Sequence, residues 1–152
     1  MPTSAPGTLA RMTAAALEAY RPTFEATDLE LRREGPSYTL DTLISVRDAA
    51  GPDVELFWIV GRDNLPELPH WYQPERIVKM ARVIAGGRPG APAPDDLPEW
   101  FCSRLTILDG PDVDVSSTSM REDIAGGDVS LAAIPEPVRR IIVSESLYGY
   151  AG

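Results

Sequence analysis

The order of apolar and polar positions along the chain predicts alternating helices and strands. Apolar residues recur every three or four positions, which is typical of helices, in the stretches 9–20, 37–47, 74–80, 116–124 and 135–142. Shorter runs predict strands at 24–31, 56–60, 83–85 and 105–108. We expect residues 1–9 to form a frayed lead-in and the proline-rich residues 87–99 to form a loop.

Strands that alternate with helices favour an α/β fold, a parallel sheet layered with helices. The uninterrupted apolar run at 56–60 predicts a strand that is buried on both faces. Ligands of such sheets bind beyond the carboxyl ends of the strands, so the candidate site follows the strands. A length of 152 residues favours a single domain over 1–152.

Composition narrows the classes of partner. The net charge is −9 and Lys and Arg form no cluster, so neither nucleic acid nor an anionic membrane is expected to bind. No apolar run approaches the roughly 18 residues of a membrane span, and the start lacks the pattern of a signal peptide. A single cysteine excludes an internal disulfide and a thiolate metal cluster. We therefore expect a cytoplasmic protein.

Hydroxyl side chains are concentrated where the helix at 116–124 begins. Ser116, Ser117 and Thr118 follow the last predicted strand, and Arg121 lies one turn further on. Such residues cap helix starts, where backbone N–H groups are free. Free N–H groups, hydroxyls and a guanidinium together suit a chain of phosphates. The alternative is an ordinary cap with a solvated Arg121.

Other polar and aromatic residues also follow predicted strands. Gly61 lets a ligand approach the backbone, and Asp63 suits ribose hydroxyls or, alternatively, caps a helix. Arg88, beside a proline, suits a phosphate or is a solvated loop residue. Trp71 and Tyr72 either plug the core or stack on a planar ring.

Six segments of the sequence together resemble a known family. They are residues 35–43, 57–63, 68–72, 87–90, 115–121 and 147–148. In this order and spacing they closely resemble bacterial nicotinate-nucleotide adenylyltransferases, from about Met12 onward. That family transfers an adenylyl group from ATP to nicotinate mononucleotide in NAD biosynthesis, giving nicotinate adenine dinucleotide and pyrophosphate. The resemblance implies a Rossmann-like, three-layer nucleotidyltransferase domain.

The resemblance also implies roles for individual residues. The motif that holds the ATP phosphates is matched by Ser116, Ser117, Thr118 and Arg121, of which Thr118 and Arg121 are implied to be catalytic. The adenosine side is matched by Gly61 and Asp63, and the nicotinate ring and its carboxylate are implied to meet Thr39, Trp71 and Tyr72. Arg88 is implied to lie near the mononucleotide phosphate. Mg²⁺ is implied together with ATP, because it usually binds through substrate phosphates.

One segment of the family is not found in the sequence. Members begin with a strand, a Gly-rich turn and a His-x-Gly-His signature, whereas this chain starts about where the second βα unit of the family ends. The only histidine, His70, lies in another segment, and we expect it on the surface. We expect either a gene start placed downstream of the true one or a shortened chain that rearranges or pairs with a partner.

Alternative functions stay open at this point. A shortened chain is expected to be a catalytically impaired nucleotide-binding module or a protein-interaction remnant of the same fold. A related adenylyltransferase, such as the pantetheine-phosphate type, would share the hydroxyl-rich helix with Arg121 but would not need Trp71 and Tyr72. A homo-oligomer is compatible with each of these functions.

Overall fold

The computed structural model describes residues 4–87, 97–110, 116–130 and 133–151. The chain divides into two compact units. The sheet unit is Gly35–Val113, and the helical unit combines Met1–Glu34 with Asp114–Gly152. Each unit is described by itself.

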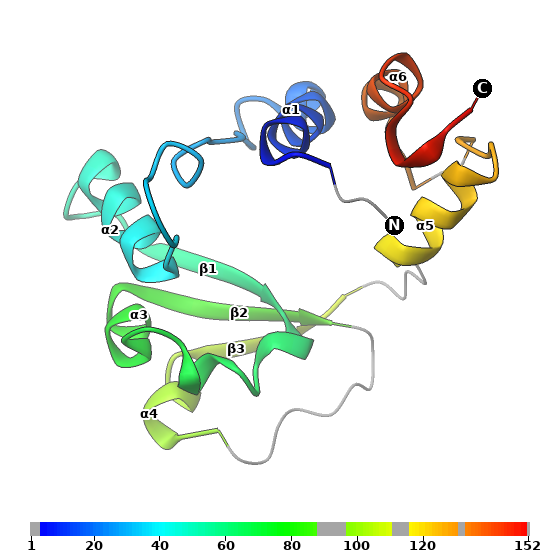
Figure 1. Cartoon of the computed structure of the whole chain (residues 1–152). Helices are drawn as coiled ribbons and strands as arrows, with labels where there is room; N and C mark the ends of the chain where they lie inside the picture. The colour runs from blue at the N-terminus through cyan, green and yellow to red at the C-terminus, as the bar shows by residue number, and fades with distance from the viewer. Residues whose placement is uncertain (1–3, 88–96, 111–115, 131–132, 152) are drawn as a thin grey trace. The chain divides into compact units, whose positions relative to one another are not determined.

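The sheet unit contains three parallel strands joined by helices (Figure 1). Its elements are α2 (Thr39–Ala50), β1 (Leu56–Gly61), the 3₁₀ turns η2 (Arg62–Asn64) and η3 (Leu68–His70), α3 (Pro74–Met80), β2 (Ala81–Gly87), α4 (Glu99–Cys102) and β3 (Leu105–Asp109). The strand order is β1-β2-β3. In the register of the sheet, Leu56 of β1 pairs with Ala81 of β2, and Val83 of β2 pairs with Leu105 of β3. The predicted α/β class with a parallel sheet is confirmed.

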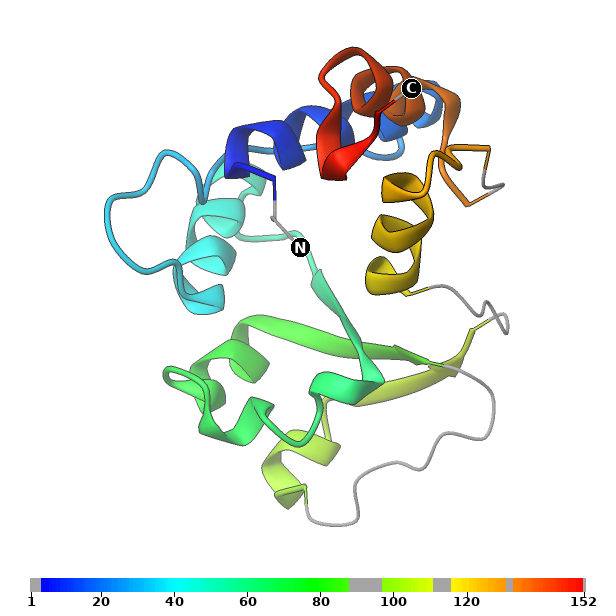
Figure 2. The same cartoon turned by 45° about the vertical axis from the view of Figure 1, so that its right-hand side comes forward.

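The core of this unit lies on one face of the sheet. Its larger cluster contains Leu65, Leu68, Val78, Val83, Ala85 and Phe101. A second cluster joins α2 and α3 to the amino ends of the strands through Leu40, Leu43, Leu56, Ile77 and Ala81. Figures 1 and 2 show α3 and α4 on the same side of the sheet. Helices α3 and α4 therefore cover one face of the sheet.

The opposite face of β1 departs from the prediction. Phe57 is 50% exposed and Ile59 is 73% exposed, so burial of this strand on both faces is wrong for the described chain. Side chains alternate between the faces of a strand, and only the set that includes Trp58 and Val60 joins the core clusters.

A second strand prediction is also wrong. Residues 24–31 contain no strand, and they end in a turn instead. Backbone and side chains bond locally there: the N–H of Leu29 donates to the Thr27 hydroxyl, and the N–H of Arg32 donates to the Asp28 carbonyl. The Arg32 guanidinium also pairs with the Asp28 carboxylate. These local bonds replace the ladder that a neighbouring strand would supply.

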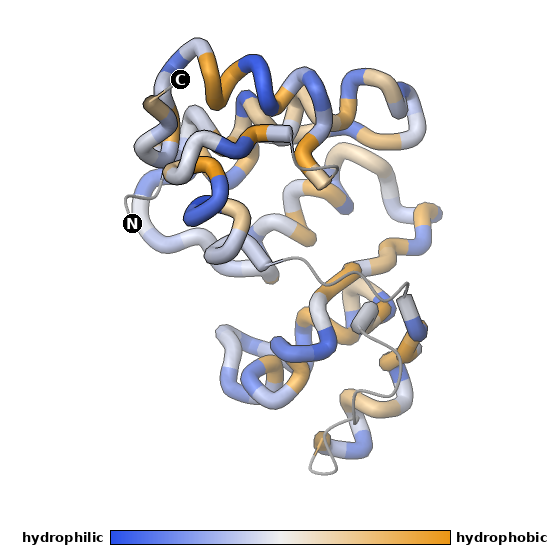
Figure 3. Tube along the Cα trace, turned by 90° about the vertical axis from the view of Figure 1, so that its right-hand side faces the viewer, coloured by the Kyte–Doolittle hydropathy of each residue, from blue (hydrophilic) through white to orange (hydrophobic). Residues whose placement is uncertain are grey.

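The helical unit consists of α1 (Pro6–Leu17), η1 (Glu18–Tyr20), α5 (Ser117–Ala125), α6 (Glu136–Ser144) and η4 (Leu147–Gly149). Helix α1 begins at Pro6 rather than at residue 9, because proline suits the first position of a helix. Met12, Ile124, Ile134 and Ile142 form its core. On α6, Ile142 is buried in this core, whereas Arg140 is exposed. Figure 3 shows hydrophobic and hydrophilic positions alternating along the chain near the C-terminus.

None of the described helices combines the length and the hydropathy that a bilayer crossing requires.

Candidate functional site

The tip of α5 is built by its own serines. Ser116 is the N-cap, and its Oγ accepts a hydrogen bond from the N–H of Ser119 at 3.0 Å. The two hydroxyls of Ser116 and Ser119 lie 2.8 Å apart, and Ser119 Oγ also donates to the Ser116 carbonyl at 3.1 Å. The predicted start of this helix is therefore confirmed. The Ser116 hydroxyl is used in this cap.

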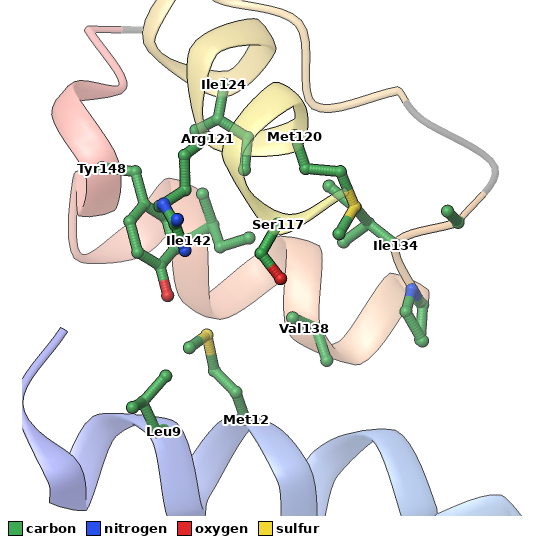
Figure 4. A pocket seen from close by; sticks show the side chains of 12 residues that line it. Leu9, Met12, Ser117, Met120, Arg121, Ile124, Ile134, Val138, Ile142 and Tyr148 are labelled. Carbon is green, nitrogen blue, oxygen red and sulfur yellow. The ribbon is translucent and has the colours of Figure 1, made fainter. Parts of the chain in front are cut away.

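The next polar side chains of α5 are not used in this way. Among the described residues, no hydrogen bond or ion pair engages the side chains of Ser117, Thr118 or Arg121. Ser117 and Arg121 line a pocket of about 250 Å³ in the helical unit, and both side chains project into it (Figure 4). The rest of the lining is mainly apolar, including Met12 and Ile142. The pocket thus offers a hydroxyl and a cation beside an apolar wall.

The carboxyl end of β1 is organised around Gly61. A Cβ at this position would collide with a carboxylate oxygen of Asp63, so the absence of a side chain leaves room for Asp63 itself. Asp63 is exposed and lies within η2, where no side chain caps the turn, so the cap alternative is not seen. Gly61 and Asp63 therefore lie together at the end of β1, and their role at an adenosine stays a prediction.

Arg62 joins the ends of all three strands. It is only 8% exposed, and its Nη2 donates to Oδ1 of Asp109, the last residue of β3, at 2.9 Å. Gly87, at the end of β2, lies against it: a Cβ there would be 2.9 Å from the Arg62 Cβ. Sequence reasoning missed this pair, although opposite charges at the ends of two parallel strands are a usable signal.

Aromatic residues gather near the start of α2. The ring centroids of Tyr38 and Tyr72 lie 4.5 Å apart. This contact places the connection between η3 and α3 near Thr39, the first residue of α2. Trp71 is half-buried and packs against Trp58, with ring centroids 5.4 Å apart, so it contributes to the core. Tyr72 is 48% exposed and therefore presents a ring to solvent.

Arg88 lies outside the described residues. His70 is exposed, as expected. The tip of α5 belongs to the helical unit, whereas Gly61, Asp63, Thr39, Trp71 and Tyr72 belong to the sheet unit. Among the described residues, no three His, Cys, Asp or Glu side chains gather closely enough to hold a metal ion.

Solved structures share this fold. The Plasmodium falciparum nicotinic acid mononucleotide adenylyltransferase complexed with APC aligns with a TM-score of 0.56 and 16% sequence identity, over 77% of this chain and 61% of its own. The same enzyme complexed with NaAD gives a TM-score of 0.56. At this identity the likeness concerns the fold alone. No model of a protein family matches the chain.

Curated relatives are more similar in sequence, and those from Dehalococcoides mccartyi, Synechococcus and Escherichia coli are named probable nicotinate-nucleotide adenylyltransferases. Identity is 33% with that of Dehalococcoides mccartyi, covering 84% of this chain and 65% of the relative. A Synechococcus relative is 36% identical over 82% of this chain and 62% of its own. The chain thus spans somewhat less than two thirds of the length of these two proteins. The Escherichia coli relative is 33% identical over 84% of this chain and 68% of its own length. The chain therefore belongs to the nicotinate-nucleotide adenylyltransferase family.

Proposed function

We propose that the protein transfers an adenylyl group from ATP to nicotinate mononucleotide. An oxygen of the mononucleotide phosphate bonds to the α-phosphorus of ATP, the bond from that phosphorus to pyrophosphate breaks, and nicotinate adenine dinucleotide forms. Such a transfer needs positioning and stabilisation of charge rather than a covalent nucleophile. Membership of the family is the observation that carries this proposal.

The phosphates of ATP are assigned to the tip of α5. Two observations support this: Ser117 and Arg121 share a pocket, and neither side chain has a partner among the described residues. Thr118 adds a hydroxyl one position further along, and Ser116 contributes by fixing the first turn. In this proposal Thr118 and Arg121 stabilise the charge that develops during transfer.

The adenosine and nicotinate groups are assigned to the sheet unit. Asp63 accepts from the ribose hydroxyls beside Gly61. Thr39, Trp71 and Tyr72 receive the nicotinate ring and its carboxylate, a role that the Tyr38–Tyr72 contact supports by holding the start of α2 near Tyr72. Arg88 is proposed to meet the mononucleotide phosphate.

The proposal extends to the setting of the site. Mg²⁺ accompanies ATP and is bound through the substrate phosphates, as this ion commonly is. The two units act as one nucleotidyltransferase domain over 1–152, in the cytoplasm, with ATP and nicotinate mononucleotide as partners and neither nucleic acid nor membrane. A homo-oligomer is compatible with this arrangement.

Pyrophosphate release by the purified chain tests the activity. ATP, Mg²⁺ and nicotinate mononucleotide are supplied, and 4′-phosphopantetheine replaces the mononucleotide in a parallel reaction. We expect release only with the mononucleotide, and a loss of about 100- to 1000-fold in kcat/KM for Arg121→Met. Arg140→Gln is the matched control, because Arg140 is an exposed cation of the same unit that pairs with Glu136. Release with 4′-phosphopantetheine alone, or none with either acceptor, would refute the proposal.

A further inference from the structure

A second pocket lies in the sheet unit, and none of the residues that line it is among those assigned above. It is lined by Glu75, Val78 and Lys79 from α3 and by Trp100, Ser103 and Arg104 from α4 and the turn after it. Its volume is about 380 Å³. This size falls within the range of small-molecule sites.

The pocket is at the amino ends of the strands. Lys79 is in the last turn of α3, just before β2, and Arg104 directly precedes β3. The Arg104 carbonyl accepts from the N–H of Val83 at 2.9 Å, which fixes this residue beside the start of β2. Gly61 and Asp63 lie at the opposite, carboxyl end of the sheet, about 20 Å away along a six-residue strand.

The two cations of this pocket, Lys79 and Arg104, differ from other described cations of the sheet unit. Among the described residues, neither Lys79 nor Arg104 has a carboxylate partner, although the chain carries a net charge of −9. Other arginines of the unit are engaged: Arg62 with Asp109, Arg82 with Glu55, and Arg47 with the Met80 carbonyl. The pocket is therefore a place where positive charge is left available for an anion.

An aromatic ring and a carboxylate complete the lining. Trp100 is half-buried and lines the pocket. Its ring meets the Phe101 ring edge-on, with the ring centroids 5.9 Å apart. An indole with one side held by the core is a firm surface for a planar ring. Glu75, on α3 one turn before Lys79, can accept from an amino group. An acidic peptide would use the cations but not the indole.

We propose that this pocket binds a nucleoside monophosphate, with its phosphate on Lys79 and Arg104 and its base against Trp100. An amino-bearing base also gives Glu75 a donor. The proposal does not depend on the adenylyl-transfer function, because none of the lining residues is assigned to that function.

Titration of the ¹⁵N-labelled chain with AMP tests it. The chain has three tryptophans, so the indole N–H of Trp100 is one of three resonances and is assigned with Trp100→Phe. We expect a saturable shift of that resonance with AMP, and at least tenfold weaker responses with adenosine or inorganic phosphate. A Lys79→Met, Arg104→Met double variant should weaken AMP at least about tenfold, since charge-assisted hydrogen bonds are lost. Arg82→Met, which removes an exposed cation of β2, should leave the affinity unchanged.

The outcomes separate the two sites. A shift of Trp71 without a shift of Trp100 would place AMP near the assigned nicotinate residues and overturn this proposal while leaving the proposed function intact. An equal response to inorganic phosphate would reduce the pocket to a plain anion site and overturn it as well. A response that survives the double variant with unchanged affinity would do the same. The spectrum of each variant reports whether it is folded.

Discussion

The tip of α5 and the carboxyl end of β1 use their polar groups in opposite ways. At the end of β1, Arg62 is buried against Gly87 and bonded to Asp109, so the charged group is part of the scaffold. At the tip of α5, Ser116 and Ser119 bond to each other and so belong to the fold, whereas Ser117 and Arg121 face a pocket. Arg62 thus orders the protein itself, whereas Ser117 and Arg121 are available to a ligand.

This difference has a consequence for substitutions. Changes that disturb Arg62 should alter the free energy of unfolding, because its packing against Gly87 and its hydrogen bond to Asp109 are lost. Changes at Ser117 and Arg121 should alter ligand binding with little effect on unfolding, because no contact inside the described chain depends on their polar groups.

The largest effect is expected at Leu65, which follows η2 and is completely buried in the main core cluster. Leu65→Ala should lower the free energy of unfolding by about 2–5 kcal/mol, measured by urea denaturation, because it removes buried methyl groups and leaves a cavity. Leu108→Ala is the matched control, since Leu108 on β3 is 51% exposed and should cost much less. Equal losses would show that the core beneath η2 is not what orders the end of β1.

A smaller effect is expected where Gly87 touches Arg62. Gly87→Ala should cost about 1–3 kcal/mol in the same measurement, because the new methyl group would press against the Arg62 Cβ rather than a flexible side-chain end. Its neighbour provides the control: a Cβ on Gly86 meets nothing within 4 Å, so Gly86→Ala should be neutral or slightly stabilising. Similar losses for both glycines would contradict the assigned packing of Arg62.

Sequence patterns predicted the elements whose signals are local. The apolar run at 56–60, Pro74 and the Ser116 cap each carry their own start or stop signal, and the structure has β1, α3 and α5 at those places. Helix α2 begins at Thr39, two residues after the predicted start at Ser37. Such shifts are typical of helix boundaries.

Patterns failed where the outcome depends on a distant partner. Residues 24–31 alternate like a strand, but alternation does not reveal whether a neighbour exists to complete the ladder. The exposure of Ile59 likewise depends on what covers the second face of the sheet. The Arg62–Asp109 and Tyr38–Tyr72 contacts join segments far apart in the chain, so they follow from strand register and packing rather than from spacing.

Two serines at the tip of α5 test the difference between a hydroxyl that is used in the fold and one that is available to a ligand. Ser116→Ala should lower the free energy of unfolding by about 1 kcal/mol, because the N–H of Ser119 loses its acceptor. Ser117→Ala should change it by less than about 0.5 kcal/mol, since its hydroxyl makes no bond among the described residues, yet it should weaken ATP binding. Calorimetric titration with ATP and urea denaturation of both variants measure the two effects. A stability loss at Ser117 equal to that at Ser116 would contradict the division of roles.

The smallest effect is expected beyond the other end of α5, at Asp128. The Ser130 hydroxyl and then the Ser130 N–H donate to its Oδ1, at 2.7 and 2.8 Å, and these bonds hold the pKa of Asp128 below the ordinary value of 3.8. A carboxyl group whose pKa is lower in the folded state stabilises the fold above its unfolded pKa. This stabilisation is lost as the pH falls through the folded pKa.

The stability difference between the wild type and Asp128→Asn should therefore be complete above pH 3.8 and should vanish in stronger acid. The carboxyl ¹³C shift of Asp128, followed from pH 6 to about pH 2, reports the folded pKa directly. Ser130→Ala removes the first cause, so the midpoint should rise toward the ordinary value. A wild-type midpoint at or above 3.8 would mean that Ser130 does not stabilise the charged carboxylate, and that this exposed turn is held by its backbone alone.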